Sequence, residues 1–354
     1  GKLNPKDFIF SGKAKEVLVR EPGSIGGQQF IVEECSECEV YLLDHTAALT
    51  VDVCTDCRIY GGPCESSFFI RDCKNCTVVV ACQQFRARDC TNCTFFLFSA
   101  TQPVIESSRD LRFSCYTLDY FSLAGQFAAA KLSVWNNKWS RVYNFTGGGE
   151  GDWSCLTPGA HHSRDFTANS LPESARQRVG YTDNTNGAVV PLTAGIRGFT
   201  PEEETCFVVV MPGHIDAVLG KLLAAGGGGD SPSSAGTSRL LRTKLFCPQP
   251  AQSKPFFDGA PASMATLASS SPVLGMQWAG AGSLEAAISL LVAAGVAVAD
   301  AKSGGEAEGR GGGDGGGGKG IVTGDCYMAD AKVSLAKAKV FFDQWGEDKG
   351  TSLA

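Results

Sequence analysis

The chain has 354 residues, and its 31 Lys and Arg against 37 Asp and Glu give a net charge of −6. This length predicts two domains, and the mildly acidic balance argues against a nucleic-acid-binding protein, whose signature is a basic surface. No apolar run of about 18 residues occurs, so no membrane-spanning helix is expected.

The first residues, Gly1 to Pro5, contain no apolar signal-peptide core. We therefore expect a reducing, cytoplasmic compartment, in which disulfides are rare. On that expectation the 15 cysteines are free thiols rather than a disulfide framework.

Four C-x-x-C pairs recur in the first third of the chain, and their first members are separated by 19, 19 and 17 residues. Each pair is followed by a short run rich in β-branched or aromatic residues. A period near 19 is too short for most two-helix repeats and fits one coil of a parallel β-solenoid. Inward-facing cysteines would then form ladders inside the coils. The pairs are Cys35/Cys38, Cys54/Cys57, Cys73/Cys76 and Cys90/Cys93.

A zinc site is the rival interpretation of these pairs, because two C-x-x-C motifs separated by 15 residues match zinc-ribbon spacing. A zinc site needs two pairs, whereas this chain has four in nearly even register, each beside a strand-like run. We favour the structural ladder and keep zinc as the alternative.

The second half of the chain changes character. Residues 146–204 are rich in Gly, Pro and polar side chains, which predicts an irregular edge followed by a linker. Strand-like and helix-like segments then alternate, as in a small α/β or α+β domain. Two Gly-rich inserts, 224–238 and 304–320, are expected to be flexible surface loops. Strands are expected at Thr205–Met211, Val273–Trp278 and Val296–Ala299, and helices at His214–Ala225, Ser283–Ala294 and Asp330–Trp345.

The run 82–89 breaks the repeat because it crowds two amides and two arginines into one short segment. In a straight strand, alternation would place Gln84, Arg86 and Arg88 on one face and Gln83 on the other, unless a coil corner intervenes. The ordinary interpretation of such an arginine is a surface residue paired with a neighbouring acid. The functional interpretation is a rigidly presented guanidinium that binds a phosphate or a carboxylate.

Three motifs in the first 145 residues are specific: Ala81-Cys82-Gln83-Gln84-Phe85-Arg86, Ala100-Thr101-Gln102-Pro103-Val104-Ile105-Glu106-Ser107-Ser108 and Asn136-Asn137-Lys138-Trp139-Ser140. With them, residues 5–145 resemble the tubulin-cofactor-C domain family, and in particular its members that activate small GTPases. The resemblance implies a right-handed parallel β-helix, with its irregular edge and linker, over residues 5–195. It implies a smaller ferredoxin-like α/β domain, similar in shape to nucleoside diphosphate kinases, over residues 200–354.

The resemblance also implies GTPase-activating activity toward a GTP-bound small GTPase of the ARF-like protein 3 type. In the family, the Arg of Gln-Gln-Phe-Arg is an arginine finger, which is Arg86 here, and Gln83 matches a polar residue that supports the same site. No cofactor of the chain's own is implied, since GTP and Mg²⁺ belong to the partner. The positions expected at the partner interface are Glu106, Phe145, Arg88 and Gln84.

The resemblance further implies a location in the cytoplasm, near the cilium and its basal body and at the periphery of the plasma membrane, with an N-terminal lipid anchor on the full-length protein. This sequence does not match the myristoylation pattern, because position 6 is Lys6 rather than Ser or Thr. The alternative function is a non-catalytic effector that binds the GTP-loaded G protein or a tubulin-folding partner. No kinase activity is expected of the second domain, which lacks a His in a plausible phosphate-accepting strand.

Overall fold

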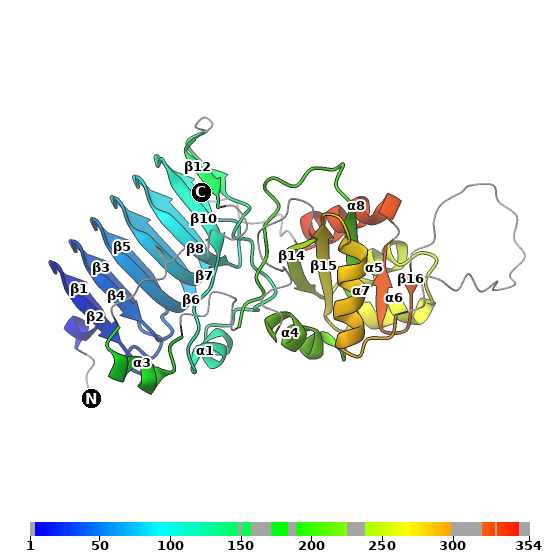
Figure 1. Ribbon diagram of the computed structural model, residues 1–354, viewed down its shortest axis with the longest axis horizontal. Helices are drawn as coiled ribbons and strands as arrows, with labels where there is room; N and C mark the ends of the chain where they lie inside the picture. Colours follow the sequence, from blue (N-terminus) through cyan, green and yellow to red (C-terminus); the bar gives the residue numbers. More distant parts are fainter. Residues whose placement is uncertain are drawn as a thin grey trace, which may run out of the picture. The chain divides into compact units, whose positions relative to one another are not determined.

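In a computed structural model, the chain divides into two compact units, Gly1–Arg197 and Gly198–Ala354 (Figure 1). The structure describes residues 4–147, 151–156, 171–182, 189–224, 238–298, 321–329 and 331–346. Almost all of both predicted Gly-rich inserts therefore lies outside the described residues. Among the helices of the described part, none is long and apolar enough to cross a membrane.

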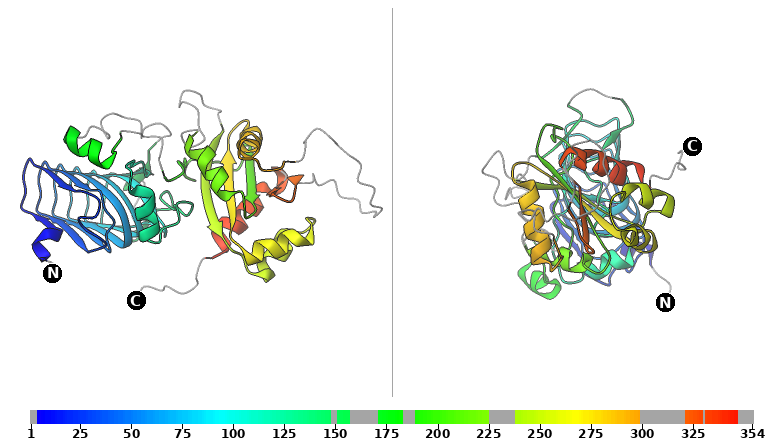
Figure 2. Two further views of the ribbon diagram at one scale, coloured as in Figure 1. Left: turned by 90° about the horizontal axis from the view of Figure 1, so that it is seen from below. Right: turned by 90° about the vertical axis from the view of Figure 1, so that its right-hand side faces the viewer.

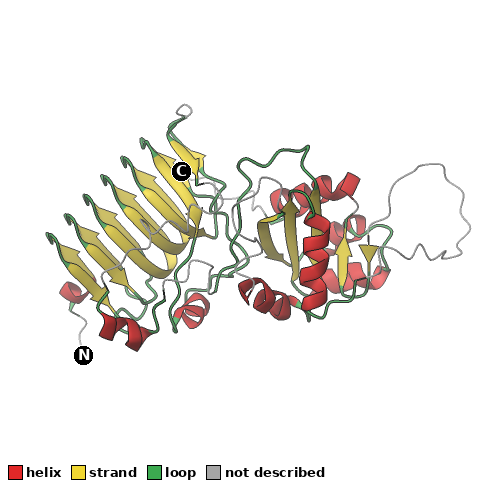
Figure 3. Ribbon diagram, in the orientation of Figure 1, coloured by secondary structure: helices red, strands yellow, loops and turns green. Residues whose placement is uncertain are grey.

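The first unit is a parallel β-solenoid, as the cysteine repeat predicts (Figure 3). The long strands β6 and β7 each run along two faces of the coil, because their pairing register shifts in the middle. One face contains β1, β3, β5, β9 and β11 with the second halves of β6 and β7, and the other contains β2, β4, β8, β10 and β12 with the first halves. The strands are β1 (Ile9–Ser11), β2 (Val17–Arg20), β3 (Phe30–Glu33), β4 (Glu39–Leu42), β5 (Leu49–Asp52), β6 (Arg58–Arg71), β7 (Thr77–Arg88), β8 (Thr94–Ser99), β9 (Val104–Glu106), β10 (Leu111–Cys115), β11 (Tyr143–Asn144) and β12 (Trp153–Cys155).

Short helices accompany the solenoid. A 3₁₀ turn, η1 (Pro5–Phe8), precedes the first strand, and the Asn4 side chain caps it by accepting a hydrogen bond from the Lys6 amide. In the described part of this unit, the helix α1 (Leu123–Ala129) lies between β10 and β11, and the helix α3 (Glu173–Val179) follows β12.

Each coil turns through a corner that contains a C-x-x-C pair. The residue before each cysteine of a pair adopts a left-handed conformation, with φ between 50° and 56°. Asn and Asp tolerate this region better than most residues, which explains why short polar side chains recur there. Glu34 and Glu37 carry longer acidic side chains, and Val53 is the one β-branched residue of the eight, at φ 51°. The eight residues are Glu34, Glu37, Val53, Asp56, Asp72, Asn75, Asp89 and Asn92.

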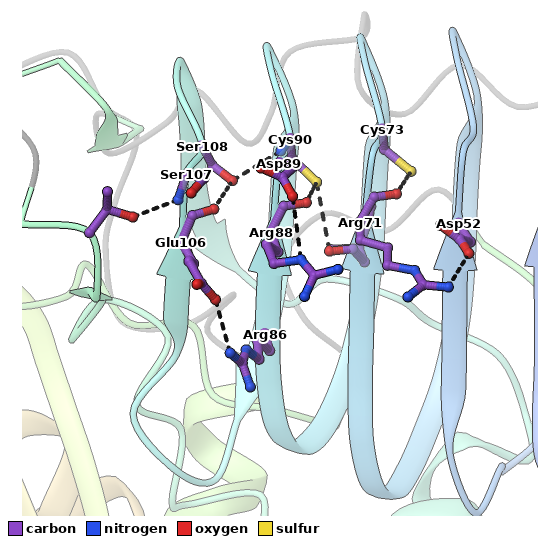
Figure 4. Close-up of polar contacts among 12 residues, drawn as sticks. Asp52, Arg71, Cys73, Arg86, Arg88, Asp89, Cys90, Glu106, Ser107 and Ser108 are labelled. Atoms are coloured by element: carbon purple, nitrogen blue, oxygen red, sulfur yellow. Dashed lines mark hydrogen bonds and ion pairs between the residues drawn. The ribbon is translucent and has the colours of Figure 1, made fainter. Parts of the chain in front are cut away.

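The cysteines of the four pairs form the predicted inward-facing ladders. All eight are buried and none forms a disulfide. Their thiols donate to backbone carbonyls two residues earlier, as Cys73 does to Arg71 at 3.1 Å and Cys90 to Arg88 at 3.3 Å (Figure 4). Within the described residues, no group of three or more His, Cys, Asp or Glu is arranged to hold a metal ion. Buried thiols that donate only weak hydrogen bonds to backbone carbonyls pack much as small apolar side chains do.

Aromatic rings fill the solenoid beneath the second half of β7. The ring of Phe85 lies 5.6 Å from that of Phe68 and 4.9 Å from that of Phe95, and Phe113 stacks on Phe95 at 5.2 Å. Contacts of this kind add to the stabilisation from buried area. The outward-facing side chains on either side of Phe85 consequently stand on a rigid base.

A buried polar network fastens the segment around α1 to the coils. The Asp44 carboxylate accepts hydrogen bonds from the amides of Ile25 and Gly26 at 2.7 and 2.8 Å. The Gln126 amide group donates to the Leu43 carbonyl at 3.0 Å. Every buried polar group that is paired in this way avoids a desolvation cost, so the network helps to define a single position for α1.

The second unit is an antiparallel sheet with helices on both faces (Figure 2), in the strand order β14-β15-β13-β17-β16. Helices α5, α6 and α8 share a hydrophobic core with Phe207 of β13, whereas α4 and α7 contact each other and α7 contacts β13. The elements are β13 (Thr205–Val210), α4 (Ile215–Ala224), β14 (Arg239–Phe246), α5 (Pro250–Phe256), α6 (Ala262–Ser270), β15 (Val273–Ala279), α7 (Ser283–Ala293), β16 (Ile321–Val322), β17 (Cys326–Met328), α8 (Ala331–Lys339) and the π-helical turn η3 (Val340–Gln344).

One predicted strand of this unit is wrong. Residues 296–298 are irregular, and residue 299 lies outside the described part. Side chains rather than a neighbouring strand satisfy this backbone: the Ala297 amide donates to the Asp325 carboxylate at 3.0 Å, and the Thr323 hydroxyl donates to the Ala297 carbonyl at 2.7 Å. The apolar run is a connection after α7, which ends in a turn at Gly295 with φ 75°.

Candidate functional site

The candidate site lies on the outer surface of the second half of β7. Parallel pairing places residues from four segments in one row across this face: Phe69 lies opposite Arg86, Arg86 opposite Val104, and Val104 opposite Tyr143. Residues far apart in the sequence therefore meet at one place. The next row holds Asp52, Arg71, Arg88 and Glu106.

Arg86 is held at the surface by two neighbours. Its Nη2 donates to Oε2 of Glu106 at 2.9 Å (Figure 4). Its Cζ lies 5.9 Å from the ring centre of Phe69. The side chain is nonetheless 52% exposed. Arginine carries five N–H donors in a planar fork, so a guanidinium held in this way keeps donors available for an anion outside the chain.

The two glutamines before Arg86 lie at a corner of the coil. Gln84 is exposed on the same face as Arg86, as strand alternation predicts, but Gln83 is exposed as well. Alternation fails at Gln83 because the pairing shifts between Cys64 and Ser67 on the neighbouring strand, so the chain is not straight there. The Gln83 carbonyl accepts from the amide and the hydroxyl of Thr101, at 3.0 and 2.9 Å.

Glu106 and Phe145 lie on the strands that follow β7 on this face. Glu106 ends β9, and its carboxylate is the acceptor for Arg86. The Phe145 amide donates to the Ile105 carbonyl at 2.8 Å, directly after β11. The Phe145 ring is 64% exposed and packs edge to face with Tyr143, itself 51% exposed, at 6.5 Å. A pair of exposed aromatic rings therefore adjoins the charged rows.

Arg88 makes an ion pair with the neighbouring Asp89, as the ordinary interpretation of an arginine in this run predicts. Its Nε lies 3.3 Å from Oδ2 of Asp89, and its side chain is 38% exposed. One coil earlier, Arg71 pairs with Asp52 at 2.6 Å. The guanidinium carbons of Arg71 and Arg88 lie 5.9 and 5.7 Å from the ring centre of Phe69, so three arginines surround one ring.

Sequence reasoning missed Phe69 and Tyr143. Phe69 lies 17 residues before Arg86, one coil earlier, so the repeat period could have identified it. Tyr143 carried no such signal, because β11 follows α1 and lies outside the cysteine repeat. Its position beside Val104 depends on tertiary pairing alone.

The fold and the site define a solenoid protein of the tubulin-cofactor-C class: the family profile described as "Tubulin binding cofactor C" matches residues 27–145. A "Protein XRP2" from Danio rerio is 38% identical over 286 residues, covering 80% of this chain and 74% of that protein. "Protein XRP2" from Homo sapiens is 35% identical over 230 residues, covering 62% of this chain and 65% of that protein. The chain belongs to the Protein XRP2 family.

More distant relatives match a smaller share of the chain. "Tubulin-specific chaperone C" from Homo sapiens is 27% identical over 136 residues, which is 38% of this chain and 39% of that protein. Among solved structures, "Tubulin Binding Cofactor C from Leishmania major" covers 34% of this chain and 85% of that chain at 24% identity and a TM-score of 0.31. The family assignment rests on the XRP2 relatives rather than on these matches.

Proposed function

We propose that this chain is a GTPase-activating protein that supplies Arg86 in trans to a GTP-bound small GTPase of the ARF-like protein 3 type. The observation that carries the proposal is the half-exposed Arg86 guanidinium, held between a carboxylate and an aromatic ring on a rigid coil. Membership of the XRP2 family, together with the Gln-Gln-Phe-Arg motif at 83–86, supports it.

The chemistry of GTP hydrolysis explains why such a group is useful. Negative charge spreads over the oxygens of the transferred phosphoryl group, and an inserted arginine stabilises that charge, an effect worth roughly 10³–10⁵ in rate. Arg suits this role because it stays charged and donates from a planar fork. A finger mounted on a stiff solenoid loses little conformational freedom on insertion. The nucleotide and Mg²⁺ belong to the partner.

The surroundings of Arg86 suit a protein partner. Phe145 would bury apolar area in the contact, since its ring is 64% exposed. Glu106, Gln84 and Arg88 flank the finger and would contribute polar contacts, and Gln83 would support the finger from the coil corner. We further propose that the activity controls release of lipidated cargo bound for the cilium, in the cytoplasm and near the basal body. A lipid anchor on the full-length protein would hold it at the periphery of the plasma membrane.

The test is single-turnover GTP hydrolysis by several purified ARF-like GTPases, with and without the chain. The proposal predicts acceleration of about 10³-fold or more for at least one of them. Binding of the GTP-loaded G protein without acceleration would overturn it and would leave the non-catalytic effector as the function.

A further inference from the structure

We propose that Arg88 is a positioning residue that takes over Glu106 when Arg86 leaves it for the partner's nucleotide. This inference rests on the proposed function. In the free chain, Glu106 is bound to Arg86 at 2.9 Å. Insertion of Arg86 into a neighbouring protein breaks that contact, so another cation must neutralise the carboxylate left beside the transferred phosphoryl group.

The need for a replacement follows from charge. Glu106 is only 26% exposed, so water screens it incompletely once its partner leaves. An unneutralised carboxylate next to the finger would repel the negative charge that develops on the phosphoryl oxygens. The site therefore functions best if the Glu106 charge is matched both before and after insertion.

Arg88 is placed to supply that match. It lies directly opposite Glu106 in the parallel pairing of β7 and β9, where adjacent strands are about 4.8 Å apart. Arg86 and Arg88 also share the ring of Phe69, at 5.9 and 5.7 Å from their guanidinium carbons. The two guanidiniums thus contact the same aromatic ring, and both side chains are long enough to reach Glu106.

Arg88 is also loosely held in the free chain. Its guanidinium is turned away from Glu106, toward Asp89 (Figure 4). Its buried Nε lies 3.3 Å from Oδ2 of Asp89, but this ion-pair contact does not have the geometry of a hydrogen bond. Arg71 cannot substitute, because it is bound to Asp52 at 2.6 Å and lies opposite Arg88 rather than Glu106. An arginine with an unsatisfied buried donor gains a hydrogen bond by turning to a vacated carboxylate.

The first experiment measures the stimulated single-turnover rate for Arg88→Gln in the wild-type and Glu106→Gln backgrounds. We expect about a tenfold loss of rate in the wild-type background and no further loss beside Glu106→Gln, because the charge to be matched is then absent. Equal losses in both backgrounds, or no loss in either, would overturn the inference. Arg58→Gln is the matched control, because Arg58 is 42% exposed and pairs with Glu39 at 2.9 Å on the other face of the solenoid. It should leave the rate within about twofold of wild type.

A second readout separates this inference from the proposed function. The side-chain ¹H–¹⁵Nε resonance of Arg88 is recorded in the free chain for Arg86→Ala, alone and combined with Glu106→Gln. If Arg88 binds the vacated Glu106, the added substitution shifts this resonance clearly in the Arg86→Ala chain and much less in the wild type. An unchanged resonance would contradict the exchange, whether or not the chain activates any GTPase.

Discussion

The two units of this protein differ in how the position of a residue in the fold depends on its position in the sequence. In the solenoid, all described strand pairings are parallel, and the coils from Cys35 onward repeat every 17 to 19 residues, so one coil largely determines the next. In the second unit the central strand β13 pairs antiparallel with β15 and β17, which come much later in the chain. The difference explains why a functional surface can be assembled from rows on the solenoid, whereas the second unit depends on contacts that have no local period.

The largest expected effect tests whether the second unit has a core of its own. Phe207→Ala removes a fully buried ring that packs against Phe256, Phe341 and Phe342. Truncations of this kind cost about 3–5 kcal/mol. Hydrogen exchange read by mass spectrometry should show loss of protection within residues 205–345 while the solenoid strands stay protected. Loss of protection in the solenoid would contradict the view that the second unit has a core of its own. Leu267→Ala is the control, because this residue is 40% exposed; its substitution should leave the protection of the second unit almost unchanged.

The next effect concerns two adjacent glycines of β6. A Cβ on Gly62 would lie 2.5 Å from the Tyr120 hydroxyl and 2.7 Å from the Asp44 carbonyl, whereas a Cβ on Gly61 would lie 3.4 Å from the Val79 carbonyl. Gly62→Ala should therefore destabilise the solenoid by about 3 kcal/mol and loosen the segment around α1, and Gly61→Ala by less than about 1 kcal/mol. Urea unfolding of the full chain measures both. Equal effects at the two positions would show that the close approach to Tyr120 is unimportant.

A smaller effect of opposite sign is expected at the coil corners. Val53 has φ 51° and is 52% exposed, so Val53→Asn should relieve a left-handed strain without losing core contacts. The gain should be about 1 kcal/mol in the free energy of unfolding. Asp72→Val, at the equivalent position one coil later, should lose a similar amount. A neutral or destabilising Val53→Asn would show that the left-handed conformation at this corner does not strain the valine.

The smallest expected effect is that of metal removal, which distinguishes thiol ladders from a zinc site. Metal analysis of the purified chain should find far less than one zinc per molecule, and a chelator should leave the melting temperature unchanged, because the thiols act as core groups. A structural zinc site would instead unfold on chelation.

Burial raises the pKa of the Cys82 thiol well above its usual value, so this cysteine should also react slowly with alkylating reagents in the folded state.

The amino-acid sequence predicts the solenoid well because period, strand-like runs and cysteine spacing all agree. The exposure of Arg86 and Gln84 follows from simple alternation along β7. Gln83 does not follow it, since a register shift on the neighbouring strand sets the corner. Tyr143 could not be placed by the repeat, because it joins the site through the pairing of β11 with β9.

The second unit was less predictable for a physical reason. Its strands β13 and β15 are largely apolar runs, and the sequence predicts both at nearly their observed bounds. Strand β14 contains Arg239, Arg242 and Lys244 among its apolar residues, so its sequence does not clearly predict a strand. The apolar run at 296–298 looked like a strand, yet side chains from the β16–β17 turn satisfy its backbone instead. Whether such a segment forms a strand depends on pairing with antiparallel strands that are distant in the sequence.

The central claim is tested most directly by Arg86→Ala in single-turnover GTP hydrolysis by the responsive ARF-like GTPase. The account predicts that this variant still binds the GTP-loaded partner, within a few-fold of the wild-type affinity, but loses about 10³-fold or more of the stimulated rate. A variant that stimulates hydrolysis as fast as the wild type would contradict the assignment of Arg86 as the finger.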